Sequence, residues 1–195
     1  MADNNPTKVV TGTVRLSYAN LIEARASFEN QPPKFSTALL IPKDDKATLD
    51  KLRRAQKAAL ENGKSSTFKG SIPKNWSDTL RDGDEEMDTE ENPEYAGHYF
   101  LNVSAQESRP PVLVNRRREK LSKDEAAELF YSGAYVRASL NAFPFNVSGN
   151  KGVSFGINAV QFVKDGDSLG GGKVNVESEF DDLGDDFDDE DDLLG

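Results

Sequence analysis

An alternating run of side chains that begins at Tyr135 offers the residue types that bind single-stranded nucleic acid. Tyr135, Arg137 and Phe143 share one face of an expected strand, whereas positions 136, 138, 140 and 142 are apolar and share the other. Unpaired bases stack on aromatic rings, and cations follow the phosphates. This face therefore predicts contacts with single-stranded DNA. The pattern is also typical of rings that pack under a loop beside a solvated arginine, and the sequence leaves that alternative open.

Further cations and the single tryptophan are spread along the chain. Arg15 lies on the polar side of an expected strand, and Trp76 stands among polar and basic residues, as a stacking residue or a core residue would. A triplet of arginines is usually a solvated loop, so it counts only in combination with the others. The predicted nucleic-acid-binding residues are Arg15, Lys34, Trp76, Arg116, Arg117, Arg118, Tyr135, Arg137, Phe143 and Lys151.

Residues for catalysis or metal binding are scarce. The chain has no cysteine and one histidine, His98, so a zinc site or a cysteine nucleophile has almost no ligands to draw on. The stretch 166–173 resembles a phosphate-binding loop, but Gly172 stands where that motif needs lysine. The carboxylates at 82–88 resemble a calcium loop, but Pro93 stands at its twelfth position. We predict no catalytic residue, no metal and no cofactor, and hence no enzyme.

The C-terminal segment is strongly acidic. Of the 34 acidic residues, eleven lie in 177–195, which holds no lysine or arginine, so the rest of the chain is near neutral although the net charge is −10. Such a tail either only solubilises the protein, or imitates a nucleic-acid strand and competes for a basic groove. In the second reading its apolar residues recruit phage or host replication and recombination proteins. These residues are Phe180, Leu183, Phe187, Leu193 and Leu194.

The elements that must position these residues are mostly strands. Alternating or apolar runs bounded by turn residues predict six strands, at 10–18, 35–41, 98–103, 111–114, 135–145 and 153–163. On the first strand Val10, Val14, Leu16 and Tyr18 form the apolar side. Helical spacing after Asp45 predicts a helix over 45–62. Ser122 and Glu125 form a capping box for a second, shorter helix that ends near Phe130.

The chain divides into a folded part and an appendage. We expect one domain over residues 1–167, with a long excursion at 64–97, and a glycine-rich linker followed by a disordered acidic tail over 168–195. No stretch approaches the roughly 20 apolar residues of a membrane span, and the start lacks the pattern of a secretory signal. We therefore expect a cytoplasmic protein that has no membrane partner, and the oligomeric state, including a homo-oligomer, stays open.

Four ordered motifs of this sequence resemble a family of phage proteins that was long regarded as a domain of uncharacterised function. They lie at 15–20 (RLSYAN), at 34–44 (KFS running into LIPKD), at 130–136 (FYSGAYV) and at 149–153 (GNKGV) with Val160-Gln161. The resemblance covers roughly residues 9–172. It implies a single-stranded-DNA-binding protein with an OB-fold, a Greek-key barrel, so the expected fold is mainly β, an OB-fold-like barrel with one or two helices and long loop insertions. A plain OB-fold places its helix after the third strand, whereas the helix at 45–62 follows the second expected strand.

Three other functions remain as alternatives. An acidic interaction protein or DNA mimic would bind a basic partner and no DNA. A strand-annealing recombinase would speed the pairing of complementary strands. A nuclease built from scattered carboxylates would need a divalent metal and would cut DNA.

Overall fold

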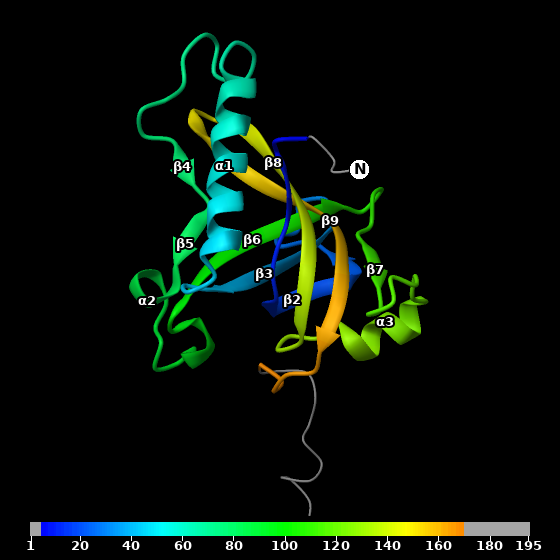
Figure 1. The fold of residues 1–195 in the computed structure, drawn as a ribbon. Helices are drawn as coiled ribbons and strands as arrows, with labels where there is room; N and C mark the ends of the chain where they lie inside the picture. Colours follow the sequence, from blue (N-terminus) through cyan, green and yellow to red (C-terminus); the bar gives the residue numbers. More distant parts are fainter. Residues whose placement is uncertain (1–4, 170–195) are drawn as a thin grey trace, which may run out of the picture.

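Five long strands form the frame of the molecule in this computed structural model, which describes residues 5–169 (Figure 1). They are β2 (Val14–Arg25), β3 (Lys34–Pro42), β6 (His98–Gln106), β8 (Tyr135–Val147) and β9 (Asn150–Lys164). The strands pair in the order β2-β3-β6-β9-β8, and β8 also pairs with β2, so the sheet closes on itself. Only β6 and β9 run parallel within this ring. This closed arrangement is the OB-fold, a five-stranded Greek-key barrel, and it confirms the predicted fold class.

Four short strands extend the ring. Strand β1 (Lys8–Val10) pairs with β8, and β5 (Leu80–Asp82) pairs with β6. Strands β4 (Ser77–Asp78) and β7 (Val112–Val114) each run parallel to β9. Strand β7 lies within the strand predicted at 111–114, and β1 meets the start of the strand predicted at 10–18, whereas β4 and β5 were not predicted.

Two helices serve different connections of the barrel. Helix α1 (Lys46–Gly63) joins β3 to β6 and packs against β8. Its N-cap is Asp45, whose carboxylate accepts a hydrogen bond from the backbone N–H of Thr48 at 3.1 Å, and its buried face includes Leu52 and Ala55. The helix predicted at 45–62 is therefore confirmed. It is an insertion between the second and third barrel strands.

Helix α3 (Lys123–Leu129) lies between the third and fourth barrel strands, which is the usual place of the OB-fold helix. The predicted capping box is present, because the Ser122 hydroxyl accepts from the backbone N–H of Glu125, and the Glu125 carboxylate accepts from the backbone N–H of Ser122. These hydrogen bonds lower the pKa of Glu125. Gly133 follows with φ 113°, a backbone conformation that glycine adopts readily because it has no Cβ. The position of α3 resolves the order of helix and strands that the sequence left open.

The remaining predicted strands are confirmed, but the first one needs a correction. Strand β1 ends at Val10, and the alternation restarts with β2 at Val14, so Val9 is 2% exposed whereas Val10 is 41% exposed. Tyr18 is 64% exposed. The prediction that Val10 and Tyr18 share the buried side with Val14 and Leu16 was therefore wrong, because the strand is interrupted between Val10 and Val14 and its register against β3 shifts between Ser17 and Asn20. The hairpin between β8 and β9 turns at Ser148 and Gly149, both with positive φ, as type I′ turns require.

The excursion at 64–97 is packed onto the barrel. Phe68, Leu80 and Tyr95 are buried, and the Tyr95 hydroxyl donates to the Ser17 hydroxyl at 3.1 Å. Within this segment lie a short helix α2 (Gly83–Glu86) and a 3₁₀ turn η1 (Pro93–Tyr95). Among residues 5–169, no helix is long and apolar enough to cross a membrane.

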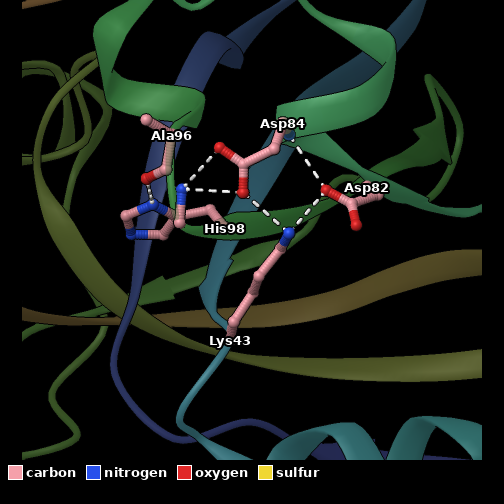
Figure 2. Close-up of polar contacts among 6 residues, drawn as sticks. Lys43, Asp82, Asp84, Ala96 and His98 are labelled. Atoms are coloured by element: carbon pink, nitrogen blue, oxygen red, sulfur yellow. Dashed lines mark hydrogen bonds and ion pairs between the residues drawn. The ribbon is translucent and has the colours of Figure 1, made fainter.

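An ionic clamp ties the acidic half of the excursion to the end of β3 (Figure 2). The ammonium group of Lys43 lies 2.7 Å from a carboxylate oxygen of Asp82 and 2.7 Å from one of Asp84. The Asp84 carboxylate also accepts from the backbone N–H of Gly97, and the His98 ring contacts the carbonyl oxygen of Ala96 at 2.7 Å. These hydrogen bonds raise the pKa of Lys43 and lower the pKa of both aspartates.

Candidate nucleic-acid interface

A groove of about 520 Å³ crosses the outer face of β2, β3 and β6. Its floor consists of small polar side chains that alternate with the buried core positions of these strands, among them Asn20, Ser36, Asn102 and Ser104. We call it the strand groove. The face formed by the second and third barrel strands, with the loops beside it, is the surface on which OB-folds bind oligonucleotides.

Two loops border the strand groove. The connection from β2 to β3 contributes Ser27, and the β8–β9 hairpin contributes Phe145 and Asn150. The hydroxyl of Ser77 donates to the side-chain oxygen of Asn150 at 2.9 Å, which joins the excursion to the hairpin. The groove is thus built from four separate parts of the chain that only the closed barrel brings together.

Tyr18 is the most exposed aromatic residue that lines the strand groove. Its side chain is 64% exposed, and its φ is 47°. The register of β2 against β3 shifts by one residue between Ser17 and Asn20, so Tyr18 sits in a β-bulge. A bulky residue at positive φ is unusual, and such strain is concentrated at functional sites. The bulge directs the ring outward, where an unpaired base can stack on it.

The strand groove continues toward Phe143. Ser104 lines both the groove and a neighbouring hollow, which also contains Phe143, Arg109 and Asn158. Phe143 is 41% exposed. The two exposed rings, Tyr18 and Phe143, therefore line two neighbouring hollows that meet at Ser104.

Lys34 is the cation of the strand groove that stays available. Within residues 5–169, its ammonium group has no hydrogen bond and no ion pair. Arg81 also lines the groove, but it is paired with Glu86 and lies over the Phe100 ring at 4.9 Å. The one carboxylate in the groove, Asp78, is bound by Arg53 and Gln56 of α1. The carboxylate of Asp78 is thus paired, which leaves the floor suited to a polyanion.

Comparison with known proteins identifies the relatives of this chain. A family model described as Enterobacter phage Enc34, ssDNA-binding protein, matches residues 7–194. The chain belongs to this family. Protein p50 of Acyrthosiphon pisum secondary endosymbiont phage 1 is 32% identical over 181 residues, which cover 90% of this chain and 94% of p50. Family membership confirms the resemblance and the expectation of a binding protein instead of an enzyme.

Solved structures of phage proteins share the fold. The single-stranded DNA-binding protein from bacteriophage Enc34, in complex with ssDNA, has a TM-score of 0.73 and 26% identity over 85% of this chain and 91% of that chain. The same Enc34 protein in a second structure has a TM-score of 0.70 and 26% identity, covering 91% and 92%. For gp2.5, encoded by bacteriophage T7, the TM-score is 0.59 at 13% identity, covering 91% and 96%, so that likeness concerns the fold alone.

Two of the predicted binding residues of this Enc34-family chain hold the end of the barrel together. Arg15 donates to the carbonyl oxygens of Gly133 at 3.0 Å and Asp167 at 2.7 Å. The Tyr135 ring lies between the Arg15 guanidinium, 5.3 Å from its centroid, and the Lys164 ammonium at 4.8 Å. We call Arg15, Tyr135 and Lys164 the barrel-end cluster. Its cation–π contacts and hydrogen bonds join the Tyr135 ring to Arg15 and Lys164, and Arg15 to the backbone.

The other predicted residues lie at several places. Lys34 lines the strand groove, Phe143 lies in the neighbouring hollow, and Lys151 follows the groove residue Asn150 in the hairpin. Arg137 donates to the carbonyl oxygen of Thr11 at 3.1 Å.

Trp76 and the arginine triplet lie apart from one another. Trp76 is half-buried and packs against the main core. Arg116, Arg117 and Arg118 are exposed in the turn after β7, where the backbone of Arg116 accepts a hydrogen bond from Gln161. The structure thus places Lys34 in the strand groove and Phe143 in the neighbouring hollow, whereas Lys151 lines neither and the triplet lies elsewhere. The predicted tail residues Phe180, Leu183, Phe187, Leu193 and Leu194 lie outside the described residues.

Sequence reasoning missed most of the strand groove. Tyr18 was placed on the core side, because strict alternation ignores a bulge. Ser36, Asn102 and Ser104 are the polar half of alternating strands, and this pattern was visible in the sequence. The pattern does not by itself distinguish a groove from an ordinary solvent-exposed face. Among residues 5–169 there is no group of His, Cys, Asp and Glu suited to a metal ion, and Asp82 and Asp84 hold Lys43 instead.

Proposed function

We propose that this protein binds single-stranded DNA in the strand groove, without sequence specificity, and coats it during phage DNA replication or recombination. The observation that carries the proposal is the exposed Tyr18 ring, held outward by a strained bulge above a polar groove. Membership of a family described as ssDNA-binding supports it, as does the fold shared with the Enc34 protein whose structure contains ssDNA.

The contacts in this proposal are stacking on rings and pairing with phosphates. Tyr18 and Phe143 supply π-faces in two neighbouring hollows that meet at Ser104, and Lys34 supplies a cation in the strand groove. Base stacking on an aromatic side chain contributes about 1–3 kcal/mol and tolerates any base. The absence of sequence specificity follows from this, because neither contact reads the edge of a base.

The acidic tail would regulate this binding and recruit partners. Its eleven carboxylates lie within 177–195, so they compete with phosphates for the cations of the barrel. Once DNA displaces the tail, its apolar residues become available to phage or host replication and recombination proteins. The domain boundary near residue 168 belongs to this proposal.

The direct test is fluorescence anisotropy of a labelled oligo-dT at two salt concentrations, with the full-length protein and a version that ends at Lys173. Affinity is expected to fall with salt, with a log–log slope of about −0.7 per phosphate neutralised. The shorter version should bind as well or better. Failure of both versions to bind at low salt would refute the proposal and favour an acidic interaction protein.

A matched pair of lysine variants sharpens this test. Lys34→Gln removes the free cation of the groove and should reduce the salt slope by about 0.7. Lys46→Gln removes an exposed lysine that follows the other end of β3, at the start of α1, and should leave the slope unchanged. Equal slopes for both variants would place the DNA elsewhere. Faster annealing of complementary strands, or cleavage that requires a divalent metal, would point to the recombinase or the nuclease.

A further inference from the structure

A second concave surface lies at one end of the barrel and is apolar. It is a pocket of about 450 Å³ between β2, β3, β7 and α3. Leu21 and Phe35 are buried at its base, and Ile22, Leu113 and Leu121 are half-buried around it. Val112 on β7 is 40% exposed at the pocket. We call it the end pocket. It lies on a different part of the barrel from the strand groove and shares no lining residue with it.

Cationic side chains lie along one side of the end pocket. Lys120 and Lys123 line it, and the turn that carries Arg116, Arg117 and Arg118 directly precedes Lys120. Lys123 forms an ion pair with Glu23 at 3.1 Å, and both side chains are well exposed. The side chains of Lys120 and the arginine triplet have no ion pair within residues 5–169. The pocket therefore suits a ligand that combines apolar side chains with negative charge.

The chain itself carries such a ligand close to the pocket. The last described residue, Leu169, donates its backbone N–H to the carbonyl oxygen of Ser132 at 2.9 Å, shortly after the end of α3. The α3 helix is about 10 Å long at 1.5 Å per residue. The eleven residues from 170 to Phe180 can span up to about 35 Å. The tail is thus long enough to reach the N-terminal end of α3, where the pocket lies.

We propose that the acidic tail docks in the end pocket of its own molecule. Phe180, Leu183 and Phe187 are spaced by three and four residues within a segment of eleven carboxylates. Their side chains fill the apolar pocket, while the carboxylates lie beside Lys120 and the arginine triplet. This assigns the triplet a role that the strand groove does not require.

Docking at this place also lets the tail act on the strand groove without filling it. Phe35 lines the end pocket, and its neighbour Lys34 lines the strand groove, because successive residues of a strand point to opposite faces. A docked tail holds negative charge near Lys34 and weakens phosphate binding there. This docking goes beyond the proposed function, because it specifies the binding site of the tail on the barrel.

A nitroxide on the tail tests the proposal in the full chain. The protein has no cysteine, so Ser178→Cys creates a unique attachment site. Paramagnetic broadening of NMR signals is expected at Val112, Leu113 and Leu121. Broadening centred on Tyr18 and Ser104 instead would overturn the proposal, and so would no broadening of any barrel signal.

Two matched substitutions and a mixing experiment complete the test. Val112→Glu adds a negative charge at the pocket and should abolish the broadening. Val10→Glu changes a valine of equal exposure, 41% against 40%, outside the pocket, and should preserve it. Broadening that survives Val112→Glu would contradict the proposal. So would broadening of an isotope-labelled protein by an unlabelled, nitroxide-bearing copy, since that places the tail on a second molecule. The anisotropy assay reports DNA binding separately, so the two proposals can fail independently.

Discussion

Two regions of this barrel combine an aromatic ring with cations, and they use the combination in opposite ways. In the barrel-end cluster, the Tyr135 ring lies between Arg15 and Lys164, and Arg15 donates to two backbone carbonyls. In the strand groove, Tyr18 is 64% exposed, and Lys34 has no ion pair among residues 5–169. Residue type alone therefore does not show whether a ring and its neighbouring cations already contact other parts of the barrel. The two regions differ in whether the ring faces and the charged groups have such partners.

Tyr18→Gly is expected to have the largest effect on DNA affinity. Loss of the ring removes about 1–3 kcal/mol of stacking, which is roughly a 5- to 150-fold weaker affinity. Glycine adopts φ 47° without strain, so the free energy of unfolding should stay equal or rise. Anisotropy and chemical denaturation measure the two quantities. Tyr18→Phe keeps the ring and should bind within about twofold of wild type; a large loss in that variant would show that stacking is not the contact.

Arg15→Met should lower the stability of the fold and leave DNA affinity nearly unchanged, which is the converse of Tyr18→Gly. It leaves the carbonyl of Gly133 without its donor and exposes one face of Tyr135, so the free energy of unfolding should fall by about 1–2 kcal/mol. Affinity for oligo-dT should change by less than about threefold at a temperature where the variant is folded. A loss of affinity as large as that of Tyr18→Gly, with unchanged stability, would move the binding site to the barrel end.

Disruption of the ionic clamp should have the smallest effect of the three changes. This effect should be visible only when the pH is varied. Lys43 lowers the pKa of Asp82 and Asp84, so their stabilisation is present above their ordinary pKa of 3.8 and is lost as the pH falls through the lower folded values. The pKa of Lys43 is raised from 10.5, so its stabilisation is lost only as the pH rises beyond that value.

Hydrogen exchange at the Gly97 amide, which donates to Asp84, measures this clamp. Lys43→Gln should lower the protection at pH 6 by less than tenfold relative to wild type, and the two proteins should converge below about pH 3. Lys46→Gln serves as the control of equal charge and should match wild type throughout. A difference between Lys43→Gln and wild type that persists at pH 2 would show that the clamp does not act through its carboxylates.

Local sequence patterns predicted much of the fold. The helix after Asp45 and the capping box at Ser122 were predictable because caps and periodicity depend on residues within one or two turns. The turn of the β8–β9 hairpin at Ser148 and Gly149 lies among the turn residues that separate the strands predicted at 135–145 and 153–163. Closure of the barrel was not predictable from periodicity, because alternation shows which face of a strand is buried and not which strand lies beside it. The order of the strands came only from the structure.

The sequence by itself determined the five long strands, the two main helices, the concentration of negative charge in the tail and the family. These depend on composition, on short-range periodicity and on motifs that stand in one stretch of chain. The tertiary structure alone decided which aromatic residues face outward and which cations are free. A single bulge at Tyr18 reverses the side chain that alternation had assigned to the core, and contacts with Gly133 and Asp167, far away in the chain, occupy Arg15. Both effects depend on long-range backbone pairing, on which a local pattern carries no information.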